Sequence, residues 1–203
     1  MSKLHSNYIS IPYKERPLNK IYTIDNALST NEIQTFINSL NNKNLEDGLV
    51  GSKSMEHKIK QNIRMCKVFW LPKNKEYLWL YTKLIDLASK ANRQLWDFDL
   101  VGADIPIQYV EYDYSYNGHY DWHLDIGNTN NSKRKLSISI QLSDSNDYTG
   151  GNLVFFNNNK QTYASKKIGS MTLFPSYILH KVEPVISGKR RALILWLTGP
   201  PFK

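Results

Sequence analysis

Two histidines and one aspartate have the residue types and spacing of a metal centre. His123 and Asp125 are separated by one residue, and His180 follows 55 residues after Asp125. Two imidazoles and one carboxylate are the ligands of the facial triad that holds non-haem Fe(II) and leaves coordination positions open. Arg190 follows ten residues after His180, and its charge suits an acidic co-substrate. The pattern therefore predicts an iron enzyme that activates dioxygen.

The ligands must be positioned by strands. Side chains of a strand alternate between its two faces, so His123 and Asp125 would project together from a strand predicted over residues 119–125. The third ligand must come from a different strand, and His180 suits this role better than His5, His57 or His119. A His-X-Asp pair alone is common by chance. Three longer stretches, at 120–125, 148–153 and 174–190, are hard to explain by packing alone and so favour a metal site.

The first half of the chain predicts helices and the second half predicts strands. Ser29 and Glu32 form a capping box before a helix that runs to Leu40, and an apolar stripe predicts a second helix over 75–95. Short strands alternate with turns after Asp97, which is typical of a sandwich or barrel with the helices packed outside one sheet. The predicted strands are 21–24, 62–71, 105–112, 119–125, 135–142, 152–156, 170–174, 180–185 and 190–197, with turns at 116–118, 143–151 and 187–188.

Composition places the chain among ordinary globular proteins. It has 203 residues, 41% of them hydrophobic and 22% charged, and a single cysteine, Cys66, which excludes an internal disulfide. Neither a long apolar run nor a secretory leader is evident, so a cytoplasmic location and no membrane association are expected. The net charge of +8 favours an acidic peptide, a ribosome-associated protein or nucleic acid as partner, although scattered basic residues also simply maintain solubility.

The chain resembles the prolyl-4-hydroxylase-like 2-oxoglutarate and Fe(II)-dependent oxygenases, specifically the PKHD-type hydroxylases. The resemblance rests on the triad stretches and on residues 64–70, 98–102, 108–112, 134–142 and 196–202. It implies a mainly β fold with N-terminal helices, the double-stranded β-helix or jelly roll. The expected organisation is one oxygenase domain over 1–203, in which 1–97 supports a jelly-roll core over 98–203.

The resemblance also implies roles for individual residues. His123, Asp125 and His180 would bind iron, and Arg190 would hold the far carboxylate of 2-oxoglutarate, because a guanidinium can grip a carboxylate through two parallel hydrogen bonds. Arg191 should point to the opposite face. Further co-substrate contacts are expected from Tyr112, Ser137, Gln141, Leu153 and Trp196. Ala192 stands where many relatives carry serine.

The substrate side is less defined. Arg134 and Tyr120 are the candidate substrate contacts, and segments 41–61 and 127–134 are candidate lids. The resemblance implies Fe(II), 2-oxoglutarate and dioxygen as cofactors, with ascorbate as an accessory reductant, and succinate and CO2 as products. A prolyl residue in a protein is the first substrate class. A free amino acid or small metabolite, oxidative demethylation of nucleic acid, and a non-catalytic binding scaffold are the alternatives.

Overall fold

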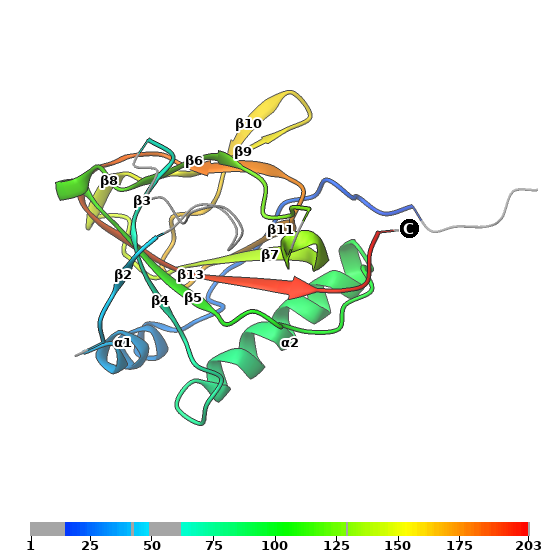
Figure 1. The fold of residues 1–203 in the computed structure, drawn as a ribbon, viewed down its shortest axis with the longest axis horizontal. Coiled ribbons are helices and arrows are strands. Elements are labelled where there is room, and N and C mark those ends of the chain that lie inside the picture. Colours follow the sequence, from blue (N-terminus) through cyan, green and yellow to red (C-terminus); the bar gives the residue numbers. More distant parts are fainter. Residues whose placement is uncertain (1–14, 42, 49–61, 129, 203) are drawn as a thin grey trace, which may run out of the picture.

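Two antiparallel β-sheets form the centre of the computed structural model, which describes residues 15–41, 43–48, 62–128 and 130–202 (Figure 1). The larger sheet has the strand order β1 (Tyr22–Ile24), β11 (Met171–Pro175), β7 (Arg134–Gln141), β13 (Val185–Thr198), β5 (Gln108–Asp113), β4 (Lys67–Trp70), β2 (Glu46–Asp47), and β8 (Tyr148–Gly150) also pairs with β13. The smaller sheet has the order β10 (Lys160–Tyr163), β9 (Leu153–Asn157), β12 (Leu179–Val182), β6 (His119–His123), β3 (Arg64–Met65).

The larger sheet is buried on both faces, and strand alternation divides its side chains between two cores. Leu136 and Ile140 of β7 and Leu195 of β13 belong to a core shared with the helices. Tyr112 of β5 and Ala192 of β13 belong to a second core, which they share with residues of the smaller sheet. The second core and the candidate site therefore lie between the two sheets.

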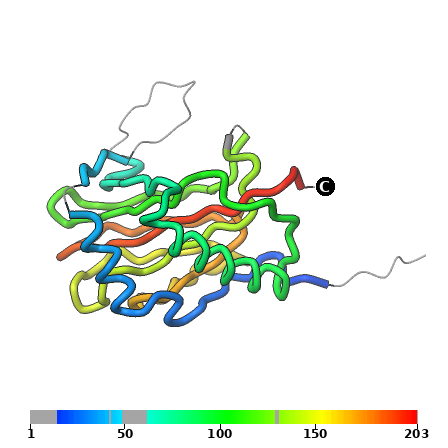
Figure 2. The backbone as a smooth tube through the Cα atoms, turned by 90° about the horizontal axis from the view of Figure 1, so that it is seen from below, coloured from blue at the N-terminus to red at the C-terminus, as the bar shows by residue number. Residues whose placement is uncertain are grey.

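Both helices cover the outer face of the larger sheet, as predicted (Figure 2). Helix α1 (Thr30–Ser39) begins at the predicted capping box, in which Ser29 Oγ accepts from the Glu32 amide at 3.3 Å and Glu32 accepts from the Ser29 amide at 2.8 Å. Helix α2 (Leu78–Leu95) begins three residues after the predicted start at 75, following Tyr77. None of the helices among the described residues is both long and apolar enough to cross a lipid bilayer.

Most predicted strands are found within three residues at each end, but β13 begins five residues before the expected Arg190. The strand predicted over 62–71 is wrong in one respect, because it breaks at Cys66 and its two halves join different sheets. The predicted turns at 143–151 and 187–188 are also partly wrong. Gly150 and Gly188 lie within strands at positive φ angles of 71° and 68°. The β8–β13 register shifts next to Gly150, between its partner Val185 and Ser187, so the pairing is irregular here.

Further short elements besides β8 were not predicted. The polar strand β10 lacks an apolar alternation, and β2 falls within the segment 41–61, of which residues 42 and 49–61 lie outside the described residues. Residues 130–133 form a 3-10 turn within the other candidate lid.

Packing of α2 against the larger sheet predicts a large difference between two leucines of that helix. Leu84 is fully buried, whereas Leu78 is 60% exposed. We expect Leu84→Ala to lower the free energy of unfolding by about 2–5 kcal/mol, because it leaves a cavity, and Leu78→Ala to change it by only about 0.5 kcal/mol. Urea denaturation of the two variants checks this, and equal effects would contradict the packing.

Candidate metal centre

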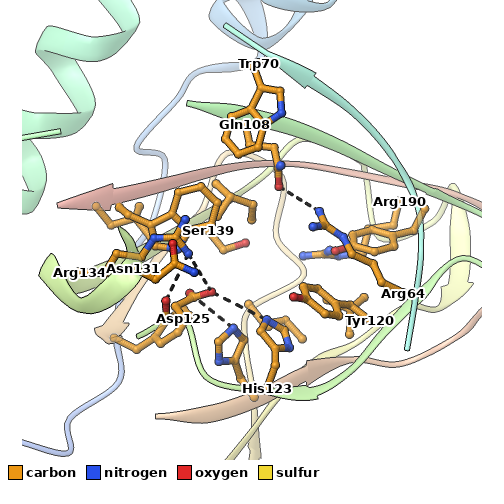
Figure 3. A pocket seen from close by; sticks show the side chains of 18 residues that line it. Arg64, Trp70, Gln108, Tyr120, His123, Asp125, Asn131, Arg134, Ser139 and Arg190 are labelled. Carbon is orange, nitrogen blue, oxygen red and sulfur yellow. Dashed lines mark hydrogen bonds and ion pairs between the residues drawn. The ribbon is translucent and has the colours of Figure 1, made fainter. Parts of the chain in front are cut away.

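A cavity of about 240 Å³ lies between the two sheets (Figure 3). Residues from both sheets line it, among them His123 and His180 from the smaller sheet and Arg190, Ile194 and Trp196 from β13 of the larger sheet. The three predicted metal ligands are together at this cavity. The structure therefore brings the sequence-predicted site into one place.

The three ligand side chains converge closely. Ligand atoms of His123, Asp125 and His180 all lie within 4.8 Å of one another. Asp125 Oδ1 is 3.8 Å from His123 Nε2, and Asp125 Oδ2 is 3.6 Å from His180 Nε2. Two atoms up to about 4.4 Å apart can both lie about 2.2 Å from one metal ion, so these two distances allow Asp125 to share an ion with each histidine.

Pairing between two neighbouring strands places the histidines. His123 ends β6 and is directly opposite His180 of β12 in the antiparallel register. The predicted strand over 119–125 is too long at its end: β6 ends at His123, so Asp125 lies outside the strand. Instead, the amides of Asp125 and Ile126 both donate to the carbonyl of Ser176 at 3.1 Å, which holds the turn that carries the carboxylate.

The orientation of both imidazoles is fixed by backbone carbonyls. His123 Nδ1 lies 2.7 Å from the Asp121 carbonyl, and His180 Nδ1 lies 2.8 Å from the Ile178 carbonyl. A carbonyl can only accept, so each Nδ1 carries the proton and each Nε2 presents a lone pair. This is the tautomer that a metal ligand requires.

The charge states also suit a metal. Burial, followed by the neighbouring His180 imidazole, lowers the pKa of His123 to about 3, so this imidazole is neutral near pH 7. Burial raises the pKa of Asp125, but His180, His123, Arg134 and a hydrogen bond from Ser137 outweigh it, and the net pKa is below the ordinary value. The centre therefore offers a neutral His123 imidazole, the His180 imidazole and one carboxylate, and two imidazoles with one carboxylate are the donor set that non-haem Fe(II) takes.

Arg190 lies at the same cavity and is 4% exposed. Its guanidinium donates a hydrogen bond to the Tyr148 hydroxyl, which also accepts from Gln141 Nε2 at 2.9 Å. Its Nη1 is buried and has no hydrogen-bond partner among the described residues. Gly151 lies beside it at a φ of 57°, and a Cβ there would stand 3.3 Å from Arg190 Cδ. A buried guanidinium with an unused donor fits a carboxylate ligand such as 2-oxoglutarate.

The other predicted residues divide into two groups. Tyr112, Leu153 and Trp196 line the cavity, as do Tyr120 and Arg134. Ser137 and Gln141 stand behind the lining. Ser137 donates to Asp125 and lies 2.9 Å from Ser176 Oγ, whereas Gln141 holds Tyr148. Arg191, as expected from alternation, projects to the other face, where its Nε lies 3.3 Å from Glu111 Oε2.

Several lining residues were not singled out from the sequence. Arg64 is the most prominent, because it is buried and its guanidinium lies 4.7 Å above the Tyr120 ring, which in turn stacks on His123 at 3.6 Å. Arg64 also donates to Gln108 at 3.0 Å and contacts Cys66 Sγ at 3.0 Å. The remaining unforeseen lining residues include Trp70, Gln108, Asn131 and Ser139. Alternation on β5 and β7 could have found Gln108 and Ser139, since they share a face with Tyr112 and Ser137.

Comparisons with known proteins agree with this geometry. Residues 107–198 match the family model of the 2OG-Fe(II) oxygenase superfamily. A PKHD-type hydroxylase of Prochlorococcus marinus strain MIT 9515 is 27% identical over 84% of this chain and 74% of its own length.

Two solved structures share the fold. A Pseudomonas putida prolyl-4-hydroxylase has a TM-score of 0.70 and 16% identity over 90% of this chain and 94% of its own. A prolyl hydroxylase from Trichoplax adhaerens, in complex with a hypoxia inducible factor peptide fragment, has a TM-score of 0.73 and 23% identity over 89% of this chain and 84% of its own.

The two histidines His180 and His119 give a matched test of the metal centre. His180 is a candidate ligand, whereas His119 on β6 does not line the cavity. We expect His180→Ala to weaken Fe(II) binding by more than roughly 100-fold, because losing even an outer hydrogen-bond partner of a ligand costs about 10–100-fold. His119→Ala should bind as the parent protein does. Anaerobic calorimetric titration with Fe(II) checks this, and parental affinity in His180→Ala would exclude the site.

Proposed function

We propose that this chain, which belongs to the 2-oxoglutarate and Fe(II)-dependent oxygenases of the PKHD type, hydroxylates a prolyl residue in a protein or peptide. We also assign its two facing sheets to the double-stranded β-helix of that superfamily. The observation that carries the proposal is the coexistence, in one cavity, of the His123–Asp125–His180 cluster and a buried Arg190 with an unused donor.

Different residues of the cavity would bind the iron and the co-substrate. The two Nε2 atoms and the Asp125 carboxylate would hold the ferrous ion, and Arg190, fixed by Tyr148, would hold a carboxylate of 2-oxoglutarate. Bound together, iron and 2-oxoglutarate supply the dioxygen chemistry that oxidises a C–H bond while 2-oxoglutarate becomes succinate and CO2. The protein contributes position, charge and exclusion of water.

Water exclusion comes from the side chains around the triad. Tyr112 and Leu153 are buried lining residues on opposite sheets, and Phe174 packs against the His180 ring with a centroid distance of 4.8 Å. Trp196, which is 5% exposed, forms another wall. In such surroundings the electrostatic interactions of the cavity are stronger than in water.

A protein substrate is supported by the size of the cavity. Its volume of about 240 Å³ is below the roughly 300–1,000 Å³ of pockets that enclose a whole drug-sized ligand. With 2-oxoglutarate bound, only the end of a further molecule fits inside. Trp70 lines the cavity while remaining 40% exposed, so it offers an aromatic surface for the part of a substrate that stays outside. The names of the relatives favour proline as the residue that enters.

Stimulated turnover of 2-oxoglutarate tests the function. The purified protein is incubated with Fe(II) and 2-oxoglutarate and, separately, with a proline-containing peptide library, free amino acids or methylated oligonucleotides. We expect the peptides to increase succinate release and to gain the mass of one oxygen atom on proline, detected by mass spectrometry. If only the oligonucleotides or only the free amino acids respond, the proposal fails.

The neighbouring arginines Arg190 and Arg191 give a matched test of co-substrate binding. We expect Arg190→Gln to weaken 2-oxoglutarate binding by roughly 30-fold or more, because removing one partner of a buried charge pair costs about 2 kcal/mol or more. Arg191→Gln changes the outer face only and should keep the parental affinity. Titration of 2-oxoglutarate into the anaerobic Fe(II) protein, followed by its visible charge-transfer absorption, measures both. Equal effects would contradict the role of Arg190.

A further inference from the structure

We propose that the substrate of this enzyme carries a carboxylate next to the hydroxylated residue and that Arg134 binds this carboxylate. The inference rests on the proposed function and adds the substrate's charge to it. It begins from the charges of the cavity. Among the described residues, the lining contains three arginines, Arg64, Arg134 and Arg190, and a single carboxylate, Asp125.

Binding of the cofactors leaves this cationic surplus in place. Fe(II) carries two positive charges and 2-oxoglutarate two negative charges, so together they add no net charge to the lining. Arg190 is the anchor of the co-substrate, and Arg64 is already engaged with Gln108, Cys66 and Tyr120. Arg134 is therefore the lining arginine that we expect to bind a further anion.

Arg134 is held rigidly beside the metal ligands. Its guanidinium carbon lies 3.9 Å above the Trp196 ring, and its Nη1 donates to the Asp125 carbonyl at 3.2 Å. A contact with the Asp125 carboxylate exists only at 4.0 Å, which is too long for a hydrogen bond. Figure 3 shows Arg134 and Asn131 on one side of the cavity, with Arg64 and Arg190 across from them. Arg134 is thus a cation placed apart from the co-substrate anchor.

Unused donors point to the same conclusion. Five buried side-chain polar atoms have no hydrogen-bond partner among the described residues, and three of them, Arg190 Nη1, Arg134 Nε and Trp196 Nε1, belong to residues that line this cavity. All three are N–H groups. Buried donors without acceptors are costly, so the cavity is built for ligands that accept hydrogen bonds. Arg190 would donate to one acceptor group, the carboxylate of the co-substrate. The stacked Arg134 and Trp196 side chains would donate to a second acceptor group.

Burial of Arg134 makes the interaction selective. The Arg134 side chain is only 11% exposed, so its charge is poorly solvated by water, and an arginine remains protonated at any physiological pH. An incoming carboxylate would restore the lost solvation through a charge-assisted hydrogen bond, whereas an amide of the same shape would do so less well. The small cavity requires this carboxylate to lie within about one residue of the carbon that reacts.

Two sources could provide such a carboxylate, and peptides distinguish them. One pair of peptides differs only in glutamate or glutamine beside the proline, on either side of it, and a second comparison uses free proline and prolinamide. Hydroxylation is measured by mass spectrometry, and binding is measured by calorimetry on the anaerobic protein loaded with Fe(II) and 2-oxoglutarate. We expect the parent protein to prefer one acidic member by roughly 10-fold or more, as a hydrogen bond to a charged group implies.

Variants assign this preference to Arg134. We expect Arg134→Gln to remove the preference for the acidic member and Arg134→Lys to retain part of it. Lys133→Gln, which removes the charge of the exposed preceding residue, should leave the preference unchanged. The ratio between acidic and neutral peptides is the decisive quantity, because a merely structural defect would reduce both. Retention of the Fe(II)–2-oxoglutarate absorption confirms that each variant keeps its metal centre.

The outcomes separate this inference from the proposed function. Equal hydroxylation of acidic and neutral peptides by the parent protein overturns the carboxylate and leaves the prolyl hydroxylase intact. Hydroxylation of free proline but of no peptide overturns the protein substrate and supports the carboxylate. If no proline compound is hydroxylated, the prolyl assignment fails. The binding measurements then test the carboxylate proposal by themselves, and equal affinities for the acidic and neutral members reject it.

Discussion

The pairing of β6 with β12 is the constraint on which the metal centre depends. His123 and His180 are directly opposite each other in that pairing, so their imidazoles meet at the inner face of the smaller sheet. A shift of one residue would turn one of them to the outer face. The carboxylate depends on the same arrangement, because Ser176, whose carbonyl binds the Asp125 amide, lies just before β12. The site is therefore a property of strand register rather than of a flexible loop.

The second constraint is the cost of burying cations. Arg190 is almost fully enclosed, and the hydroxyl of Tyr148, its hydrogen-bond acceptor, is neutral. An enclosed charge without an opposite charge destabilises the fold, so the free energy that such residues lose in folding is recovered when an anion binds. Gly151 is part of this enclosure, because a Cβ there would stand 3.3 Å from Arg190 Cδ, so its missing side chain leaves room for the stem of Arg190. Binding of an anionic co-substrate should consequently stabilise the folded protein as well as prepare it for reaction.

Residue types and alternation were sufficient to predict that His123, Asp125, His180 and Arg190 lie together, and to predict most of the strands. They predicted that His123 and Asp125 project together, although Asp125 reaches the site from a turn, which depends on a bond to Ser176 that no local pattern shows. The break at Cys66 was equally hidden, because both halves of 64–70 look like one strand and only the tertiary fold sends them to different sheets. Arg64 was missed for the same reason. A basic residue in a short strand is normally exposed, and its burial against Tyr120 follows from the break beside it.

The positions of the basic residues in the fold, rather than their number, indicate which of them can bind an anion. The sequence has 26 lysines and arginines, yet only three of those in the described part of the chain line the cavity, and all three are arginines. Strand alternation places the neighbours Arg190 and Arg191 on opposite faces of β13. Arg190 enters the cavity, whereas Arg191 forms an ion pair with Glu111 on the outer face. Exposed charges are screened by salt and contribute little, whereas a buried guanidinium interacts with an anion at low effective dielectric. The net charge of +8 is thus weak evidence for an acidic partner. Arg134, enclosed beside the metal ligands, is far stronger evidence, because the nearest carboxylate oxygen, Asp125 Oδ1, is 4.0 Å away and an anion that enters the cavity could approach the guanidinium more closely.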